Sequence, residues 1–225
     1  MFKRFRENIR KAVVYRRQSK LPNVLLIIGA ITIFTLAYIL LSMLFIPDKA
    51  TLDYNFLRER GTITALSAIY MAMASAFSGV ALVISIREKN RHYWLWVFLM
   101  LGFVFFAFDE LLKFHEQADR IIGRFISPGF FRGWNDIIVI LYGVIALLIL
   151  VALLPSLLRY RMVLETLGAG FLFYGIHTVI DSTVDPRTIL STIIEESAKV
   201  ISVELLALGA FIGVLALLWN FSPPD

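Results

Sequence analysis

Six long apolar segments dominate this sequence and constrain its fold more than any other feature. They occupy residues 23–46, 62–86, 93–112, 137–154, 162–180 and 197–219. Because an α-helix rises 1.5 Å per residue, about 20 apolar residues cross the hydrocarbon core of a bilayer. The segments are close to that length, so the sequence predicts an all-α fold, a polytopic membrane bundle of six transmembrane helices.

Composition excludes an ordinary soluble domain. Of the 225 residues, 59% are hydrophobic and only 17% are charged, with a mean hydropathy of +0.77. Soluble domains carry about 25% charged residues. The chain contains no cysteine, which excludes disulfides, thiolate metal ligands and a cysteine nucleophile. We expect a basic juxtamembrane segment over residues 1–20 and a single transmembrane domain over residues 21–225.

The net positive charge of the chain comes from its first 20 residues. This segment carries a net charge of +7, whereas the remaining residues sum to −2. Apolar residues recur within it at helical spacing, at Phe2, Phe5, Ile9 and Val13. Such a segment is typical of an amphipathic helix on the anionic cytoplasmic leaflet of a lipid bilayer. Nucleic-acid binding is not expected, since the body of the protein is not basic.

The distribution of basic residues also predicts the orientation of the bundle. Residues 1–20 and the short loops at 87–91 and 159–161 hold 13 of the 22 lysines and arginines. These segments alternate with loops that are richer in acidic residues. Because cytoplasmic loops carry the excess of lysine and arginine, we expect both termini in the cytoplasm.

Ionisable side chains collect at the opposite, extracytoplasmic end of the predicted helices. They are Asp109, Glu110, Lys113, His115, Glu116, His177, Asp181, Glu195, Glu196 and Lys199. Counting the helical rise from the cytoplasmic boundary of each helix places Asp109, His177 and Glu204 in one layer, roughly 22–24 Å from that boundary. Ionisable groups near hydrocarbon are costly, so they usually face a cavity or one another. The pattern therefore predicts a polar site between helices.

One interpretation of this cluster is a transition-metal site. Histidine and carboxylate ligands suit zinc, iron or manganese, and a carboxylate outside the coordination sphere can act as general base. The predicted ligands are Asp109, His115, Glu116, His177, Asp181 and Glu195, and the predicted catalytic carboxylates are Glu110 and Glu196. A hydrogen bond from His177 to Asp181 would orient the imidazole toward a metal.

Structural interpretations of the same residues stay open. On a continuous helix, one narrow face would carry an ion-pair stripe formed by Asp109, Lys113, Glu116 and Arg120. His177 could be a hydrogen-bonded histidine that joins two helices. Glu204 has no cation within one helical turn, so it must be protonated or find His177, Lys113 or a water cavity.

Small residues at regular spacing predict close helix packing. Gly209 and Gly213 form a GxxxG pattern in the sixth segment, where a missing side chain lets a neighbouring helix approach. We interpret the pattern as a contact inside the bundle. A homo-oligomer or a membrane partner remains possible on this sequence.

The run from Asp109 to Glu116 resembles a short element of a known group of proteins. It reads Asp-Glu-x4-His-Glu, and Glu195-Glu196 opens the last apolar segment. This combination resembles prokaryotic six-helix membrane proteins that carry both elements and have no assigned activity. The resemblance implies the same architecture and, for this chain, an integral protein of a prokaryotic plasma membrane.

Three functions are compatible with these patterns. The first is an extracytoplasmic carboxylate and histidine cluster that binds a transition metal for hydrolytic or redox chemistry. The second is a non-catalytic membrane subunit or sensor that docks partners. The third is proton-coupled transport through Glu204, Asp109 and His177, although the cytoplasmic halves of the helices offer no polar path. The sequence does not decide whether the protein is an enzyme.

Overall fold

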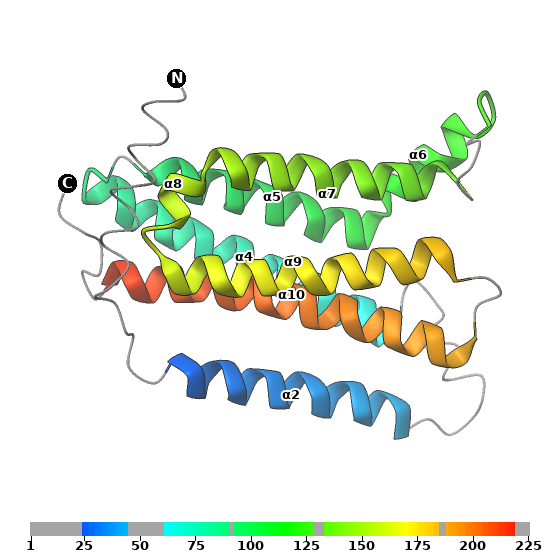
Figure 1. The fold of residues 1–225 in the computed structure, drawn as a ribbon, viewed down its shortest axis with the longest axis horizontal. Coiled ribbons are helices and arrows are strands. Elements are labelled where there is room, and N and C mark those ends of the chain that lie inside the picture. The colour runs from blue at the N-terminus through cyan, green and yellow to red at the C-terminus, as the bar shows by residue number, and fades with distance from the viewer. Residues whose placement is uncertain (1–23, 45–60, 91, 128–132, 185–187, 219–225) are drawn as a thin grey trace.

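The computed structural model describes residues 24–44, 61–90, 92–127, 133–184 and 188–218, and their regular elements are all helical (Figure 1). These are α2 (Val24–Leu44), α4 (Thr62–Arg87), α5 (Tyr93–Leu112), α6 (Phe114–Ile122), α7 (Trp134–Ala152), α8 (Leu154–Leu157), α9 (Arg161–Thr183) and α10 (Ile189–Leu218). All but α6 and α8 are long and apolar enough to cross a membrane. The predicted six-helix bundle is confirmed. The predicted amphipathic helix of residues 1–20 lies outside the described residues.

Helix α10 forms the centre of the bundle. It packs along α9 and α4 and also contacts α2. Buried residues recur along most of its length, and many of them are small, such as Ala207, Ala210 and Ala216. Since lipid tails are as apolar as core side chains, close van der Waals contact at small residues holds membrane helices together. This explains why the helix richest in buried small residues occupies the centre.

The GxxxG pattern of α10 makes contacts within the bundle, as predicted. A methyl group on Gly213 would overlap the indole ring of Trp96 from α5, and Trp96 is fully buried. A methyl group on Gly209 would lie 2.8 Å from Leu167 Cδ2 of α9. Each glycine therefore gives a different neighbouring helix room to approach α10.

The last helix begins earlier than the sequence predicts. It starts at Ile189 rather than at residue 197, so Glu195 and Glu196 lie inside the helix. Both acidic side chains are therefore held on a continuous helical scaffold that reaches the end of the bundle. The other five predicted spans match α2, α4, α5, α7 and α9 to within a few residues.

A break between α5 and α6 determines how the acidic residues face one another. Lys113 lies between the two helices with a φ of 57° and a ψ of 49°, a left-handed conformation that is uncommon for a residue other than glycine. Below the break, Leu112 O accepts a 2.7 Å hydrogen bond from Gln117 Nε2. The continuous helix assumed for the predicted ion-pair stripe is therefore wrong.

Helix α7 stands at the edge of the bundle (Figure 1). Asp136 is its one buried residue, and most of its apolar side chains face outward. Its first turn is capped from α6, because Asp119 Oδ1 accepts hydrogen bonds from the backbone nitrogens of Trp134 and Asn135 at 2.6 and 3.3 Å. This cap joins the start of α7 to the polar end of the bundle.

Candidate functional site

A cavity lies at the end of the bundle where α5 and α9 end and α10 begins. It has a volume of about 230 Å³ and is lined by side chains from α4, α5, α6, α7, α9 and α10, besides Lys113 between α5 and α6. We call it the polar cavity. Its lining includes all eight residues predicted as ligands or catalytic groups, namely Asp109, Glu110, His115, Glu116, His177, Asp181, Glu195 and Glu196. The structure thus brings the whole predicted cluster together in space.

Asp109 and His115 form a dyad across the helix break. Asp109 Oδ2 lies 2.6 Å from His115 Nδ1, and Asp109 Oδ1 accepts a 3.1 Å hydrogen bond from the backbone nitrogen of His115. The Asp109 side chain is 8% exposed and that of His115 is 18% exposed. The two contacts fix the ring and leave Nε2 without a hydrogen-bond partner among the described residues.

The charge of Asp109 affects the protonation of His115, which lies outside the membrane-spanning helices. Burial lowers the pKa of His115, but the hydrogen bond and the negative charge of Asp109 raise it, with further contributions from Glu116 and Glu110. The net effect raises the pKa of His115 above its ordinary value of 6.5. The carboxylate of Asp109 therefore favours the protonated form of the imidazole, which is the arrangement of an acid–base dyad.

Lys199 connects the two predicted catalytic carboxylates. Its Nζ lies 2.7 Å from Glu196 Oε2 on the same helix and 3.2 Å from Glu110 Oε1 on α5. The pair with Glu196 has the i, i+3 spacing of neighbours on one helix, whereas the bridge to Glu110 joins two helices. Both carboxylates are thus held as charged acceptors beside a cation.

The remaining charges of the cluster pair differently from the sequence prediction. Glu116 lies 3.0 Å from Lys113 Nζ and 3.4 Å from Arg120 Nη2, so this part of the predicted stripe forms. Asp109 is not part of this stripe, because the break between α5 and α6 brings His115 to the carboxylate of Asp109. Asp119, one helical turn beyond His115, caps α7.

His177 lies next to Glu195 on the far wall of the cavity. The distance from His177 Nδ1 to Glu195 Oε1 is 3.9 Å, and Nδ1 has no hydrogen-bond partner in the described part of the chain. The sequence suggested Asp181 as the carboxylate that orients this imidazole. The carboxylate oxygen at 3.9 Å from this ring nitrogen belongs to Glu195.

The structure does not support the predicted transition-metal centre. Within the described residues, no three histidine, aspartate or glutamate side chains converge in a way that could hold a metal ion. The physical reason is that the charges are engaged elsewhere: Glu110 and Glu196 face Lys199, Glu116 faces Lys113, and His115 binds Asp109 through Nδ1. Zinc, iron or manganese binding at these residues is therefore not proposed.

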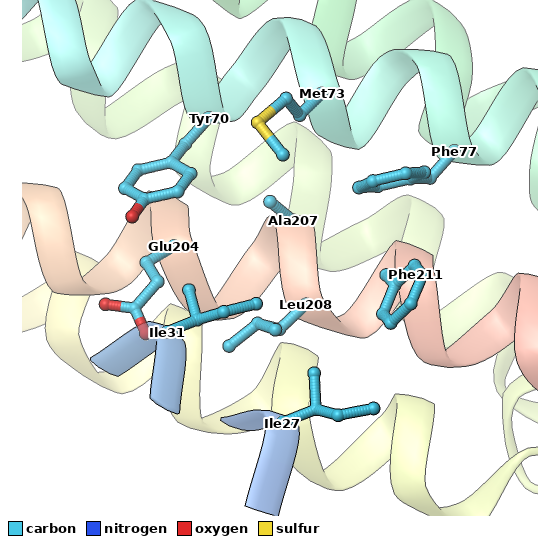
Figure 2. A pocket seen from close by; sticks show the side chains of 9 residues that line it. All are labelled: Ile27, Ile31, Tyr70, Met73, Phe77, Glu204, Ala207, Leu208 and Phe211. Carbon is cyan, nitrogen blue, oxygen red and sulfur yellow. The ribbon is translucent and has the colours of Figure 1, made fainter. Parts of the chain in front are cut away.

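Glu204 lies apart from this cluster, although the helical rise places it in the same layer as Asp109 and His177. It is fully buried on α10 and accepts a 2.6 Å hydrogen bond from Thr32 Oγ1 of α2. Figure 2 shows Glu204 and Tyr70 beside a separate, mainly apolar pocket of about 160 Å³. Glu204 therefore meets threonine hydroxyl groups of α2, those of Thr32 and Thr35.

The geometry defines the class of this protein: a membrane helix bundle with an ionisable cavity at one end. The chain belongs to the family described as Domain of unknown function (DUF8692), whose model matches residues 24–215. No curated protein and no solved structure matches the chain.

Proposed function

We propose that the chain is an integral membrane protein with an acid–base site at the extracytoplasmic end of its bundle. In this proposal the polar cavity binds the positively charged group of an organic ligand, and His115 accepts and returns a proton. The observation that carries it is the 2.6 Å contact between Asp109 Oδ2 and His115 Nδ1 at the cavity wall.

The chemistry of the proton transfer follows from the geometry of the dyad. A donor group of the ligand gives its proton to Nε2 of His115, which becomes an imidazolium while the ligand group becomes neutral. Asp109 stays ionised, orients the ring through Nδ1 and stabilises the imidazolium. The proton returns by the reverse step. We assign the proton-accepting role to His115 because Glu110 and Glu196 both lie beside Lys199.

The lining of the cavity supports a cationic ligand. Six carboxylates and two lysines line it, so its formal charge from the described residues is negative. Aromatic walls accompany the acids, contributed by Phe106, Tyr142 and Tyr174. Ammonium groups bind well where carboxylates and aromatic faces meet. A phosphate or carboxylate head group would instead be repelled.

Butylamine is a suitable probe for this proposal. We would reconstitute protein labelled with ¹³C-histidine in phosphatidylcholine nanodiscs and follow the His115 resonance during a butylamine titration. The expected result is a saturable shift, weakened roughly tenfold in apparent affinity by Glu196→Gln, which removes one negative charge from the lining of the cavity. Glu165→Gln is the matched control, since Glu165 pairs with Arg161 and does not line the cavity.

Two outcomes would contradict the proposal. One is a His115 resonance that butylamine leaves unchanged in the unmodified protein. The other is an equal loss of affinity in Glu196→Gln and Glu165→Gln, which would indicate nonspecific adsorption. Stable co-purification of a partner protein that covers the cavity would instead favour the non-catalytic subunit considered from the sequence.

A further inference from the structure

A second, apolar cavity runs along the outside of the bundle next to the polar one. It has a volume of about 460 Å³ and is bordered by α5, α7, α9 and α10, and we call it the apolar groove. Its lining is hydrophobic apart from the hydroxyl group of Tyr142. Leu101 and Ile145 on its walls are 54% and 46% exposed. Because this surface faces lipid, a membrane-dissolved molecule can enter the groove sideways.

The groove and the polar cavity adjoin each other. Phe106 and Tyr142 line both of them, and their rings meet edge to face with centroids 5.9 Å apart. On α10, Val203 lines the polar cavity and Leu206, three residues further along, lines the groove. The two spaces therefore follow one another along the bundle axis, with an aromatic pair at their border.

The length of the groove fits a single apolar chain. Its lining extends from Tyr142 on α7 to Leu153, the residue that follows this helix, and on α5 from Phe98 to Phe106. At 1.5 Å per residue these stretches cover roughly 12–16 Å, about half of the hydrocarbon core. An acyl or isoprenoid tail lying along the helices would fill such a groove while its head group reached the polar cavity.

We propose that the two cavities form one binding site for a single-chain amphiphile, with an amine head group in the polar cavity and an apolar tail in the groove. This inference rests on the proposed function for the head group and adds the class of ligand. The negative lining of the cavity selects the amine, because an anionic head group of the same chain length would meet like charge. The groove positions the tail rather than supplying most of the affinity, since lipid solvates the free tail equally well.

Glycines in the helices provide a clean test of the tail site. A side chain on Gly102, which lines the groove, would meet no atom within 4 Å of its Cβ, so Gly102→Phe fills the groove without a clash at that atom. Gly168 on α9 has equally open space around it and does not line the groove. Gly168→Phe is therefore the matched control. Thermal unfolding in detergent would establish that both variants fold.

The experiment uses a dodecylamine that carries a photoreactive diazirine near the end of its tail. Protein in phosphatidylcholine nanodiscs is irradiated with this probe, and labelled residues are mapped by mass spectrometry. We expect labels on the groove-lining segments of α5 and α7. The amount of label there should fall roughly tenfold in Gly102→Phe and stay unchanged in Gly168→Phe. A carboxylic acid with the same tail should label roughly tenfold less, which reflects the lost charge-assisted contact.

The possible failures are distinguishable. If butylamine still shifts His115 but the labels spread over all lipid-facing helices, the tail site is wrong and the proposed function stands. If butylamine and the long-chain probe both fail to bind, the proposed function is wrong as well. Groove labels that appear equally with the acid and the amine would overturn the selection by charge. If the probe instead joins two copies of the chain through α5 and α7, the groove is covered by a second copy, and this result would overturn the ligand site.

Discussion

Replacing Lys199 by methionine should destabilise the protein strongly, because it leaves two carboxylates without their shared cation. At an effective dielectric constant near 20, a charge pair 3.2 Å apart, the distance from Lys199 to Glu110, is worth about 5 kcal/mol before desolvation. The Lys199 side chain is 16% exposed and contacts a cavity large enough for water, which weakens this attraction. Breaking a buried pair by removing one partner costs about 3–5 kcal/mol, and we expect a loss near 3 kcal/mol.

The assay is unfolding in dodecyl maltoside by increasing fractions of SDS, followed by tryptophan fluorescence. Arg120→Met is the control, since it removes the same charge from an ion pair with Glu116 in which the arginine is 69% exposed, and should cost less than about 1 kcal/mol. The double variant Lys199→Met/Glu110→Gln should regain about 1–3 kcal/mol of the free energy of unfolding, because one of the two unpaired carboxylates is removed. Equal stability of Lys199→Met and Arg120→Met, or no recovery in the double variant, would refute this reasoning.

Two further substitutions, with Gly102→Ala as a control, test contacts between the helices of the bundle. Gly213→Ala should lower the free energy of unfolding by about 1–3 kcal/mol through overlap with Trp96, whereas Gly102→Ala, with open space around it, should be neutral or stabilising by up to about 1 kcal/mol. The same SDS titration checks both, and equal effects would contradict the close approach of α5 and α10. Thr32→Val should destabilise the protein by about 1–3 kcal/mol, because the buried Glu204 loses the hydroxyl group that donates its 2.6 Å hydrogen bond. Unchanged stability of this variant would show that α2 does not supply that contact.

The architecture was predictable because the membrane leaves few alternatives. Hydropathy and helical rise alone located five of the six spans to within a few residues, and the predicted range 93–112 coincides with α5. The same counting of residues along helices placed Asp109 and His177 at one height, and both line the polar cavity. Where backbone hydrogen bonds must be satisfied inside each segment, length and composition determine the element.

The contacts within the site were not predictable, because they depend on one irregular residue. Lys113 adopts a left-handed conformation without a glycine to signal it, and this break lets Asp109 reach both the ring and the backbone of His115. Helical spacing instead placed Asp109 in a stripe with Lys113. The partner of Glu204 lay in the first apolar segment, where Thr32 is one of few polar residues and was a signal that could have been used.

The sequence also cannot tell which charges meet across helices. Spacing along α10 allows Lys199 to pair with either Glu195 or Glu196, and the structure pairs it with Glu196. Glu195 instead lies beside His177 of α9, and Glu110 reaches Lys199 from α5. These pairings depend on how the helices are rotated about their axes. They bring Glu110, Glu196 and Lys199 from two helices into one network of ion pairs.

Protonation of His115 should also influence the pH dependence of stability. The pKa of His115 is raised in the folded protein. Its interaction with Asp109 therefore makes its full contribution to stability at pH values below 6.5, the ordinary pKa of histidine. This contribution is lost as the pH rises through the folded-state pKa. Asp109→Asn should flatten the decline in stability over that range.

The dyad itself is tested most directly by an NMR titration of His115 in nanodiscs, comparing the unmodified protein with Asp109→Asn. With the carboxylate 2.6 Å from Nδ1, the imidazole should titrate above 6.5 in the unmodified protein and at a clearly lower pH in the variant. Identical titration midpoints in the two proteins would mean that Asp109 does not contact His115, and the proposed acid–base site would be wrong.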